Sequence, residues 1–161
     1  MSIVKVVKNL KFSYLKTVFW FGINHPLFSL ATLQATIITF KISQQKFPNK
    51  HGKENKANAF RHALWNMLIL KKSLVFTKDV SKAETWTKKI TDLHEELSPN
   101  RAISRAMDLK NNELGRHWIK VNLELSDSEI VKFLEKKLQE AQKISKISEI
   151  AIQSNLVYLE E

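Results

Sequence analysis

Three short segments of the sequence contain polar residues whose types could do chemistry. They are NAFRHALWN at residues 58–66, TDLHEEL at 91–97 and MDLKNNELGR at 107–116. His62, His94, Glu95 and Asp108 are of the kinds that bind divalent metals or act as general acids and bases. A bound divalent ion would lower the pKa of a water molecule and so turn it into a nucleophile. These four residues are therefore the predicted catalytic groups of a hydrolytic site, either metal-assisted or acid/base.

Amide and guanidinium side chains lie in the same segments. The candidates for substrate binding are Asn58, Arg61, Asn111, Asn112 and Arg116. Arginine can hold phosphate or carboxylate through two parallel hydrogen bonds, and asparagine can orient a bound group. We therefore expect a small anionic substrate, such as one that contains phosphate. A divalent metal ion is the cofactor that this residue set suggests, and its predicted ligands are His62, His94 and Asp108.

The same residues also have a purely structural interpretation. Buried polar groups must be hydrogen-bonded, so a network among Asn58, His62, Asp108 and Arg116 could simply hold packed helices in register. The adjacent His94 and Glu95 do not form the HExxH motif of zinc proteases, because residue 98 is serine. The sequence leaves both interpretations open.

The composition favours helices as the elements that position these residues. The chain has 161 residues, of which 43% are hydrophobic, and only 3 are glycine and 3 are proline. This is enough apolar material for one domain with a core, and too few turn residues for a sheet with many connections. Cysteine is absent, which excludes disulfides, a thiolate nucleophile and cysteine-ligated zinc. We predict a compact all-α domain of about five to six helices.

Hydrophobic periodicity and capping signals predict where the helices lie. They are expected at about residues 3–21, 26–45, 56–74, 81–97, 101–121 and 126–145, the last with a continuation through 152. Ser81 precedes Glu84 by three residues, which is the spacing of a capping box, and the run from Ser126 to Glu129 opens the last helix. The domain thus divides into basic, aromatic-rich N-terminal helices (1–45), a core that contains the three segments (45–118) and a C-terminal amphipathic helix (126–152). Within the core the polar candidates recur at three or four residues, so each helix would carry them on one stripe.

The formal net charge of +10 is unevenly distributed along the chain. Residues 1–53 contain eight lysines and no acid, whereas the stretch from Asp127 has five lysines and seven acids. A basic region that includes FSYLKTVFWFG could contact anionic lipid or another polyanion, or it could be an ordinary solvated face with its aromatic residues in the core. The alternative function is therefore a non-catalytic binding module whose basic N-terminal region contacts a protein, nucleic acid or an anionic membrane surface. The absence of a known nucleic-acid motif disfavours nucleic acid.

The N-terminal third does not have the pattern of a secretory signal or a membrane span. Lysines interrupt its early apolar residues, and polar residues interrupt the apolar stretch from Leu27 to Ile42 before it reaches about 18 residues. We expect this stretch to be a buried helix and the protein to be cytoplasmic. Peripheral attachment to a membrane through Phe19, Trp20 and Phe21 is the alternative.

The three segments also resemble the blocks of an uncharacterised bacterial domain family, the domain of unknown function numbered 6973. The resemblance covers about residues 45–118. The matching positions are Asn58, Arg61, His62, Trp65, Asn66, His94, Glu95, Asp108, Asn111, Asn112, Gly115 and Arg116. Domains of this family occur at the C-termini of larger bacterial proteins, including toxin-like ones, and this favours a hydrolytic site. Two positions depart from the family pattern: Lys110 replaces a frequent histidine, and Asn58 replaces the commoner aspartate, which removes a carboxylate.

Overall fold

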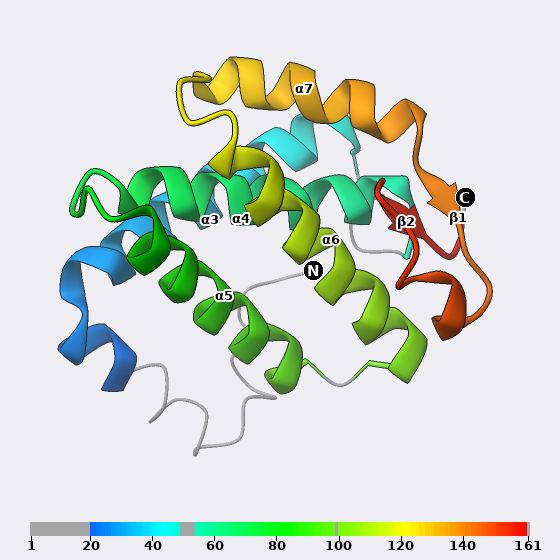
Figure 1. The fold of residues 1–161 in the computed structure, drawn as a ribbon, viewed down its shortest axis with the longest axis horizontal. Coiled ribbons are helices and arrows are strands. Elements are labelled where there is room, and N and C mark those ends of the chain that lie inside the picture. Colours follow the sequence, from blue (N-terminus) through cyan, green and yellow to red (C-terminus); the bar gives the residue numbers. More distant parts are fainter. Residues whose placement is uncertain (1–19, 49–53, 99, 161) are drawn as a thin grey trace.

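The structure, a computed structural model, describes residues 20–48, 54–98 and 100–160. Its α-helices with defined bounds are α3 (Pro26–Lys46), α4 (Lys56–Ser73), α5 (Val80–Leu97), α6 (Ala102–Lys120) and α7 (Asp127–Gln139). Two short strands, β1 (Gln142–Lys143) and β2 (Val157–Tyr158), and a 3₁₀ helix, η1 (Ile147–Glu149), follow (Figure 1). The all-α prediction is confirmed. The helix expected at 3–21 lies outside the described residues, except for its last two positions.

Local side chains cap the starts of two helices, α4 and α7, that begin close to where they were predicted. Asn55 accepts a backbone hydrogen bond at the start of α4, and Ser126 with Glu129 forms a capping box at the start of α7. At the start of α5 the prediction was wrong by two residues. The capping residue is Asp79, whose side chain accepts from a backbone N–H, and Ser81 already lies inside the helix.

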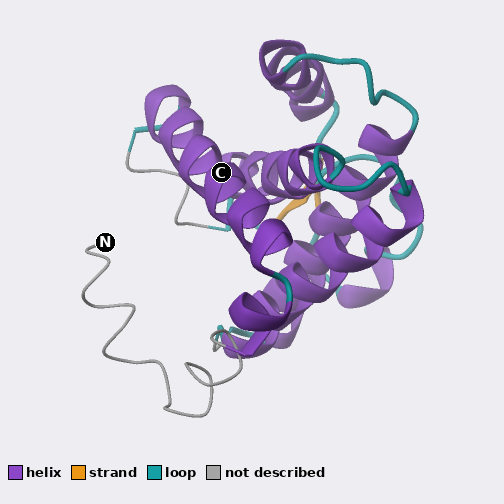
Figure 2. Cartoon of the chain, turned by 90° about the vertical axis from the view of Figure 1, so that its left-hand side faces the viewer, coloured by secondary structure: helices purple, strands orange, loops and turns teal. Residues whose placement is uncertain are grey.

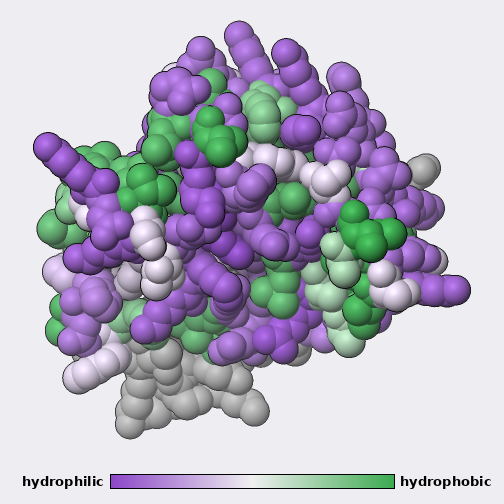
Figure 3. Space-filling view, in the orientation of Figure 1, coloured by the Kyte–Doolittle hydropathy of each residue, from purple (hydrophilic) through white to green (hydrophobic). Residues whose placement is uncertain are grey.

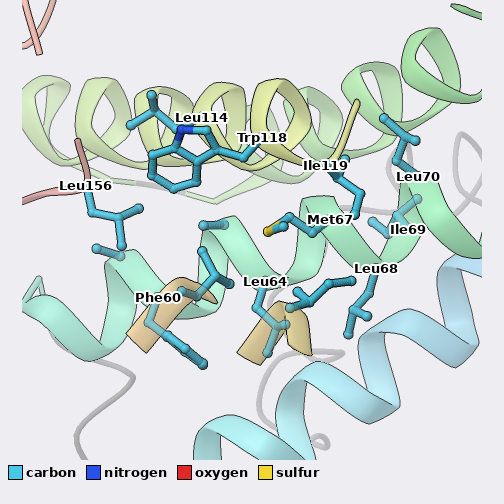
Figure 4. Close-up of a cluster of buried hydrophobic side chains, with 14 of the residues drawn as sticks. Phe60, Leu64, Met67, Leu68, Ile69, Leu70, Leu114, Trp118, Ile119 and Leu156 are labelled. Carbon is cyan, nitrogen blue, oxygen red and sulfur yellow. The ribbon is translucent and has the colours of Figure 1, made fainter. Parts of the chain in front are cut away.

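Helix α4 is the centre of the fold. It contacts α3, α5, α6, α7 and β2, and the views in Figures 1 and 2 show the other helices arranged around it. The largest fully buried apolar side chains of α4 are Phe60, Leu64, Met67, Leu68, Ile69 and Leu70. Figure 4 shows these residues together with Leu114, Trp118 and Ile119 of α6 and with Leu156. The hydrophobic core therefore forms around one helix, and that helix also contains two of the predicted site residues that face α6.

A glycine allows α4 and α6 to approach closely. A Cβ atom added to Gly115 would lie 2.5 Å from the carbonyl oxygen of Ala63 and 2.9 Å from its Cα. Both distances are too short for any side chain, so only glycine fits at this crossing. Short polar side chains on the two helices can then hydrogen-bond to each other directly.

The C-terminal region differs from the prediction of a helix that continues beyond residue 145. Helix α7 ends at Gln139, and β1 then pairs in parallel with β2, with Gln142 opposite Val157. Ile144 and Ile150 pack with Met107 of α6 in a second small apolar cluster. Their spacing resembles that of an amphipathic helix, but pairing with a distant strand overrides this local pattern.

Helix α3 differs from the prediction of a buried helix. One face is buried against α4 and consists of small residues: Ala31, Ala35, Thr39 and Ser43. The opposite face exposes Leu27, Leu30, Leu33 and Ile37. None of the described helices is both long and apolar enough to cross a membrane.

Candidate functional site

The predicted polar stripes meet where α4, α5 and α6 pack together. Side chains of α4 pair with side chains of α6 that lie 50 residues further along: Asn58 with Asp108, His62 with Asn112, and Asn66 with Arg116. These pairs recur every four residues, so the two helices run in the same direction with constant register. We call the set the polar ladder; it consists of Asn58, Arg61, His62, Asn66, Thr91, Glu95, Asp108, Asn112 and Arg116.

His62 lies at the centre of the polar ladder between two carboxylates. Its Nδ1 is 3.4 Å from Oε1 of Glu95, and its Nε2 is 3.4 Å from Oδ1 of Asp108. All three residues are nearly inaccessible to solvent, with exposed fractions of 3%, 2% and 4% in the order His62, Glu95 and Asp108. One nitrogen or oxygen from each lies within 4.8 Å of the others, which is close enough for one metal ion to bind all three.

Both ring nitrogens of His62 have polar neighbours within hydrogen-bonding range. Nη2 of Arg61 lies 3.0 Å from Nε2 of His62. The same Nε2 lies 3.4 Å from Oδ1 of Asp108, so it is placed between a hydrogen-bond donor and a carboxylate acceptor. Nδ1 donates to Oδ1 of Asn112 at 3.1 Å, with Glu95 also in reach.

Two asparagines hold the carboxylates in place. Asn112 receives hydrogen bonds at Oδ1 from His62 and from Asn66, and its amide nitrogen donates to Glu95 at 3.1 Å. At the next rung Asn58 donates to Asp108 at 2.9 Å and accepts from Arg61. Each of these two amides donates through its nitrogen and accepts at its oxygen, so its hydrogen-bond partners determine its orientation.

The other end of the polar ladder joins all three helices through Arg116. Its Nη1 donates to Oδ1 of Asn66 on α4 at 2.8 Å and to Oγ1 of Thr91 on α5 at 3.3 Å. Thr91 donates to the same oxygen of Asn66 at 3.2 Å. Burial lowers the pKa of Arg116, and nearby acids oppose this effect. In this arrangement Arg116 binds protein groups of the helix junction.

The two carboxylates have pKa values shifted in opposite directions. Burial raises the pKa of Asp108 and the negative charge of Glu95 adds to this, against the opposing effects of His62, Arg61 and Asn58. Burial also acts to raise the pKa of Glu95, but hydrogen bonds from His62 and Asn112 and neighbouring positive charge outweigh it and lower the pKa. Pairs of groups with pKa values pushed apart in this way are typical of acid/base centres.

Comparison with known proteins identifies the family. The family model described as "Domain of unknown function (DUF6973)" matches residues 19–142. The chain belongs to this family. The match spans α3 to α7 and the whole polar ladder, and it extends well beyond the segment 45–118 on which the resemblance was based. No curated protein and no solved structure matches the chain.

Two predicted site residues of this DUF6973 domain point away from the cluster formed by His62, Glu95 and Asp108. His94 is exposed, and its ring lies edge-on against Trp65 with ring centres 5.2 Å apart. Asn111 makes two hydrogen bonds of 2.9 Å with the backbone of Val157, so it anchors β2. Among the described residues, the group close enough to hold a metal contains Glu95 where His94 was expected.

The two departures from the family pattern have different surroundings. Asn58 belongs to the polar ladder, where its amide donates to Asp108, which the usual aspartate could not do when ionised. Lys110 pairs with Glu113 on its own helix, at 3.3 Å. The carboxylate usual at position 58 is therefore replaced by an amide, and this amide donates a hydrogen bond to the carboxylate of Asp108.

Asn66 and Thr91 belong to the polar ladder but were not among the predicted site residues. Both are fully buried and hydrogen-bond to each other and to Arg116. Asn66 lies one helical turn after His62, and Thr91 lies one turn before Glu95. The same four-residue spacing that identified the other candidates would have identified these two.

Proposed function

We propose that this DUF6973 protein is a metal-assisted hydrolase that acts on an anionic, phosphate-containing substrate. One observation carries the proposal: His62, Glu95 and Asp108, from three different helices, bring potential ligand atoms within 4.8 Å of one another. Imidazole nitrogen and carboxylate oxygen together suit zinc, iron and manganese. Three protein ligands would leave a further position for water, as in catalytic metal sites.

The position of the His62 ring supports metal binding. Metals bind imidazole nitrogen, and here Nε2 lies 3.4 Å from the carboxylate of Asp108, another potential ligand. The guanidinium of Arg61 is the cation that faces both groups. A divalent ion would bind where Arg61 now contacts Nε2 and would release this arginine from its present partner.

Arg61 is the predicted substrate-binding residue best placed to hold an anion. It borders the cluster and is only half-buried, whereas His62, Glu95 and Asp108 are almost fully buried. Its guanidinium could bind two phosphate oxygens of a substrate that approaches from this side. The metal would lower the pKa of a bound water from 15.7 to about 7, and so generate the nucleophile for hydrolysis at neutral pH.

The raised pKa of Asp108 favours this proposal over a purely structural network. Arg61 faces the negative charges of Glu95 and Asp108, and amide groups donate to both carboxylates, so hydrogen bonding alone could account for most of the polar ladder. A structural network, however, gains nothing from a buried carboxylate whose charge is disfavoured by its surroundings, and an amide would serve as well. Such groups occur preferentially at functional sites.

The test compares metal binding by the full chain and by Asp108→Asn. Asparagine keeps the shape of the side chain and can still accept from Asn58, but it is a poor ligand for the metal. We expect Mn²⁺ or Zn²⁺ to stabilise the wild-type chain by about 3 kcal/mol at a hundred times the dissociation constant and the variant much less. Asp92→Asn is the matched control, since this carboxylate pairs with Lys88 at the surface. It should bind metal like the wild type.

Hydrolysis is tested with bis(p-nitrophenyl) phosphate in the presence of the metal that stabilises the chain. We expect activity in the wild type and in Asp92→Asn, and at least a hundredfold loss in Asp108→Asn, on the order of the contribution of a catalytic group. Unchanged melting temperatures and no metal in the purified or metal-soaked protein would reject the metal centre. Circular dichroism shows whether each variant is folded.

A further inference from the structure

The guanidinium of Arg61 lies against the cluster of His62, Glu95 and Asp108. Its Nη2 is 3.0 Å from Nε2 of His62, and it also donates to Oδ1 of Asn58. The charges of Asp108 and Glu95 act to raise the pKa of Arg61, whereas burial lowers it. The positive charge of Arg61 therefore faces the same two carboxylates that a divalent ion would bind.

A divalent ion and Arg61 would compete for this place. A metal ion bound to Nε2 of His62 would lie about 2.1 Å from that nitrogen. An imidazole nitrogen has a single lone pair, so it cannot serve a metal ion and the guanidinium at the same time. The two cations would also repel each other in surroundings that contain little water. Metal binding at the cluster therefore requires Arg61 to leave Nε2.

A released guanidinium needs new acceptors. Arg61 is half-buried, so its long side chain can turn toward solvent while α4 stays in place. With a divalent ion bound, the ion offsets the charges of Glu95 and Asp108, and the charge of Arg61 is left without a counter-charge. A phosphate group offers two oxygens that a guanidinium can hold in parallel, together with negative charge close to the metal.

The surface around the site also suits a charged ligand. Figure 3 shows the face formed by α5 and α6, the helices that carry Glu95 and Asp108, as mainly hydrophilic, with hydrophobic residues in separate patches. Such a face offers little contact area to an apolar ligand. A small anion is the better fit.

We propose that Arg61 couples the two ligands of this site, so that a divalent metal ion and a phosphate group bind cooperatively. Without phosphate, Arg61 occupies Nε2 of His62 and disfavours the metal. With phosphate, Arg61 turns to the anion and the metal enters. By linkage, each ligand raises the affinity for the other by the same factor. The proposal rests on the metal centre proposed above and adds that the site takes metal and phosphate as a pair.

The experiment titrates Mn²⁺ into the full chain by calorimetry, with and without methylphosphonate at constant ionic strength. Methylphosphonate has the charged oxygens of a phosphate ester but no ester bond to hydrolyse. A titration of Mn²⁺ into methylphosphonate alone corrects for complexes in solution. We expect methylphosphonate to tighten Mn²⁺ binding by at least about fivefold, the lower end of usual couplings between sites. Mn²⁺ should tighten methylphosphonate binding by the same factor.

Arg61→Met shows whether the arginine is responsible. Methionine has a similar length but no charge and no hydrogen-bond donor, and its sulfur is a poor ligand for Mn²⁺. Without methylphosphonate this variant should bind Mn²⁺ at least about fivefold more tightly than the wild type, because the competing cation is gone. Methylphosphonate should add little. Arg101→Met is the matched control, since Arg101 pairs with Glu54 outside the polar ladder, and it should behave like the wild type.

The possible results separate this coupling from the metal centre itself. Mn²⁺ binding that methylphosphonate leaves unchanged in the wild type would overturn the coupling alone, whether or not any variant folds. So would an Arg61→Met variant that binds Mn²⁺ more weakly than the wild type, as expected if Arg61 only supports the cluster, or one that keeps the full effect of methylphosphonate. No Mn²⁺ binding by either protein, with or without methylphosphonate, would reject the metal centre and the coupling with it. If circular dichroism shows that Arg61→Met is unfolded, Arg61→Gln, which can still donate to Asn58, takes its place.

Discussion

The two sides of helix α4 are equally buried but are held by different interactions. On one side Phe60, Leu64 and Leu68 pack in the apolar core, and on the other Asn58, His62 and Asn66 carry the polar ladder. Apolar contacts have no direction, so that side requires only volume and shape. The polar side requires a donor opposite every acceptor, in one register of α4 against α6. Stability and site geometry therefore rest on different halves of the same helix.

The largest expected effect is on the apolar side and concerns stability alone. Leu64→Ala removes a fully buried side chain and should lower the free energy of unfolding by about 2–5 kcal/mol. Metal affinity of the folded protein should stay near that of the wild type. Urea unfolding and metal titration measure the two quantities. A large loss of metal affinity in a folded Leu64→Ala variant would show that the two sides are coupled.

The next largest effect concerns Gly115, where α4 and α6 cross and which determines how closely the two helices pack. Gly115→Ala places a Cβ 2.5 Å from the oxygen of Ala63, so α4 and α6 must separate. We expect a loss of about 1–3 kcal/mol together with weaker metal binding, since the polar ladder needs the close approach. Gly22→Ala is the control, because a Cβ there meets no atom within 4 Å. A Gly115→Ala variant as stable as the wild type would show that the helices can adjust at little cost.

Smaller effects distinguish the two carboxylates on the polar side. Glu95→Gln replaces the charged acceptor of His62 and Asn112 by a neutral one and should cost about 1 kcal/mol. Asp108→Asn should leave stability at neutral pH unchanged or raise it in the absence of metal, because burial disfavours the charge that it removes. Thermal and urea unfolding at pH 7 compare the two variants. Equal destabilisation by both would favour a structural network.

The smallest expected effect is the pH dependence of the contributions of Asp108 and Glu95 to stability. The folded protein raises the pKa of Asp108, so it binds this proton more tightly than the unfolded chain does, and the contribution of Asp108 to stability falls as pH rises from its ordinary pKa to the raised one. The stability of Asp108→Asn relative to the wild type should therefore increase over this range and then level off. Glu95 has the opposite sign, since its lowered pKa gives stability above the ordinary value that is lost as pH falls. Urea unfolding between pH 3 and pH 7 measures both trends.

The helix bounds and most residues of the site could be predicted from the sequence, because both follow from patterns over a few neighbouring positions. The bounds of α3, α4 and α6 agree with the predictions to within one residue because periodicity, Pro26 and side-chain caps act over a few positions. The three sequence segments do meet, as their stripes indicated. The predicted metal set still included His94, because residues next to each other on a helix point about 100° apart and only packing determines which of His94 and Glu95 faces inward.

The order of residues along the chain determined an all-α domain and brought His62, Glu95 and Asp108 into consideration, since helical period and residue type are local properties. Only the tertiary structure decided that Glu95 faces the cluster, that Asn111 serves β2, and that the chain after Gln139 pairs as strands. It also decided that α3 leaves an apolar face uncovered. These outcomes depend on contacts between segments far apart in the chain, whose energies no local pattern contains.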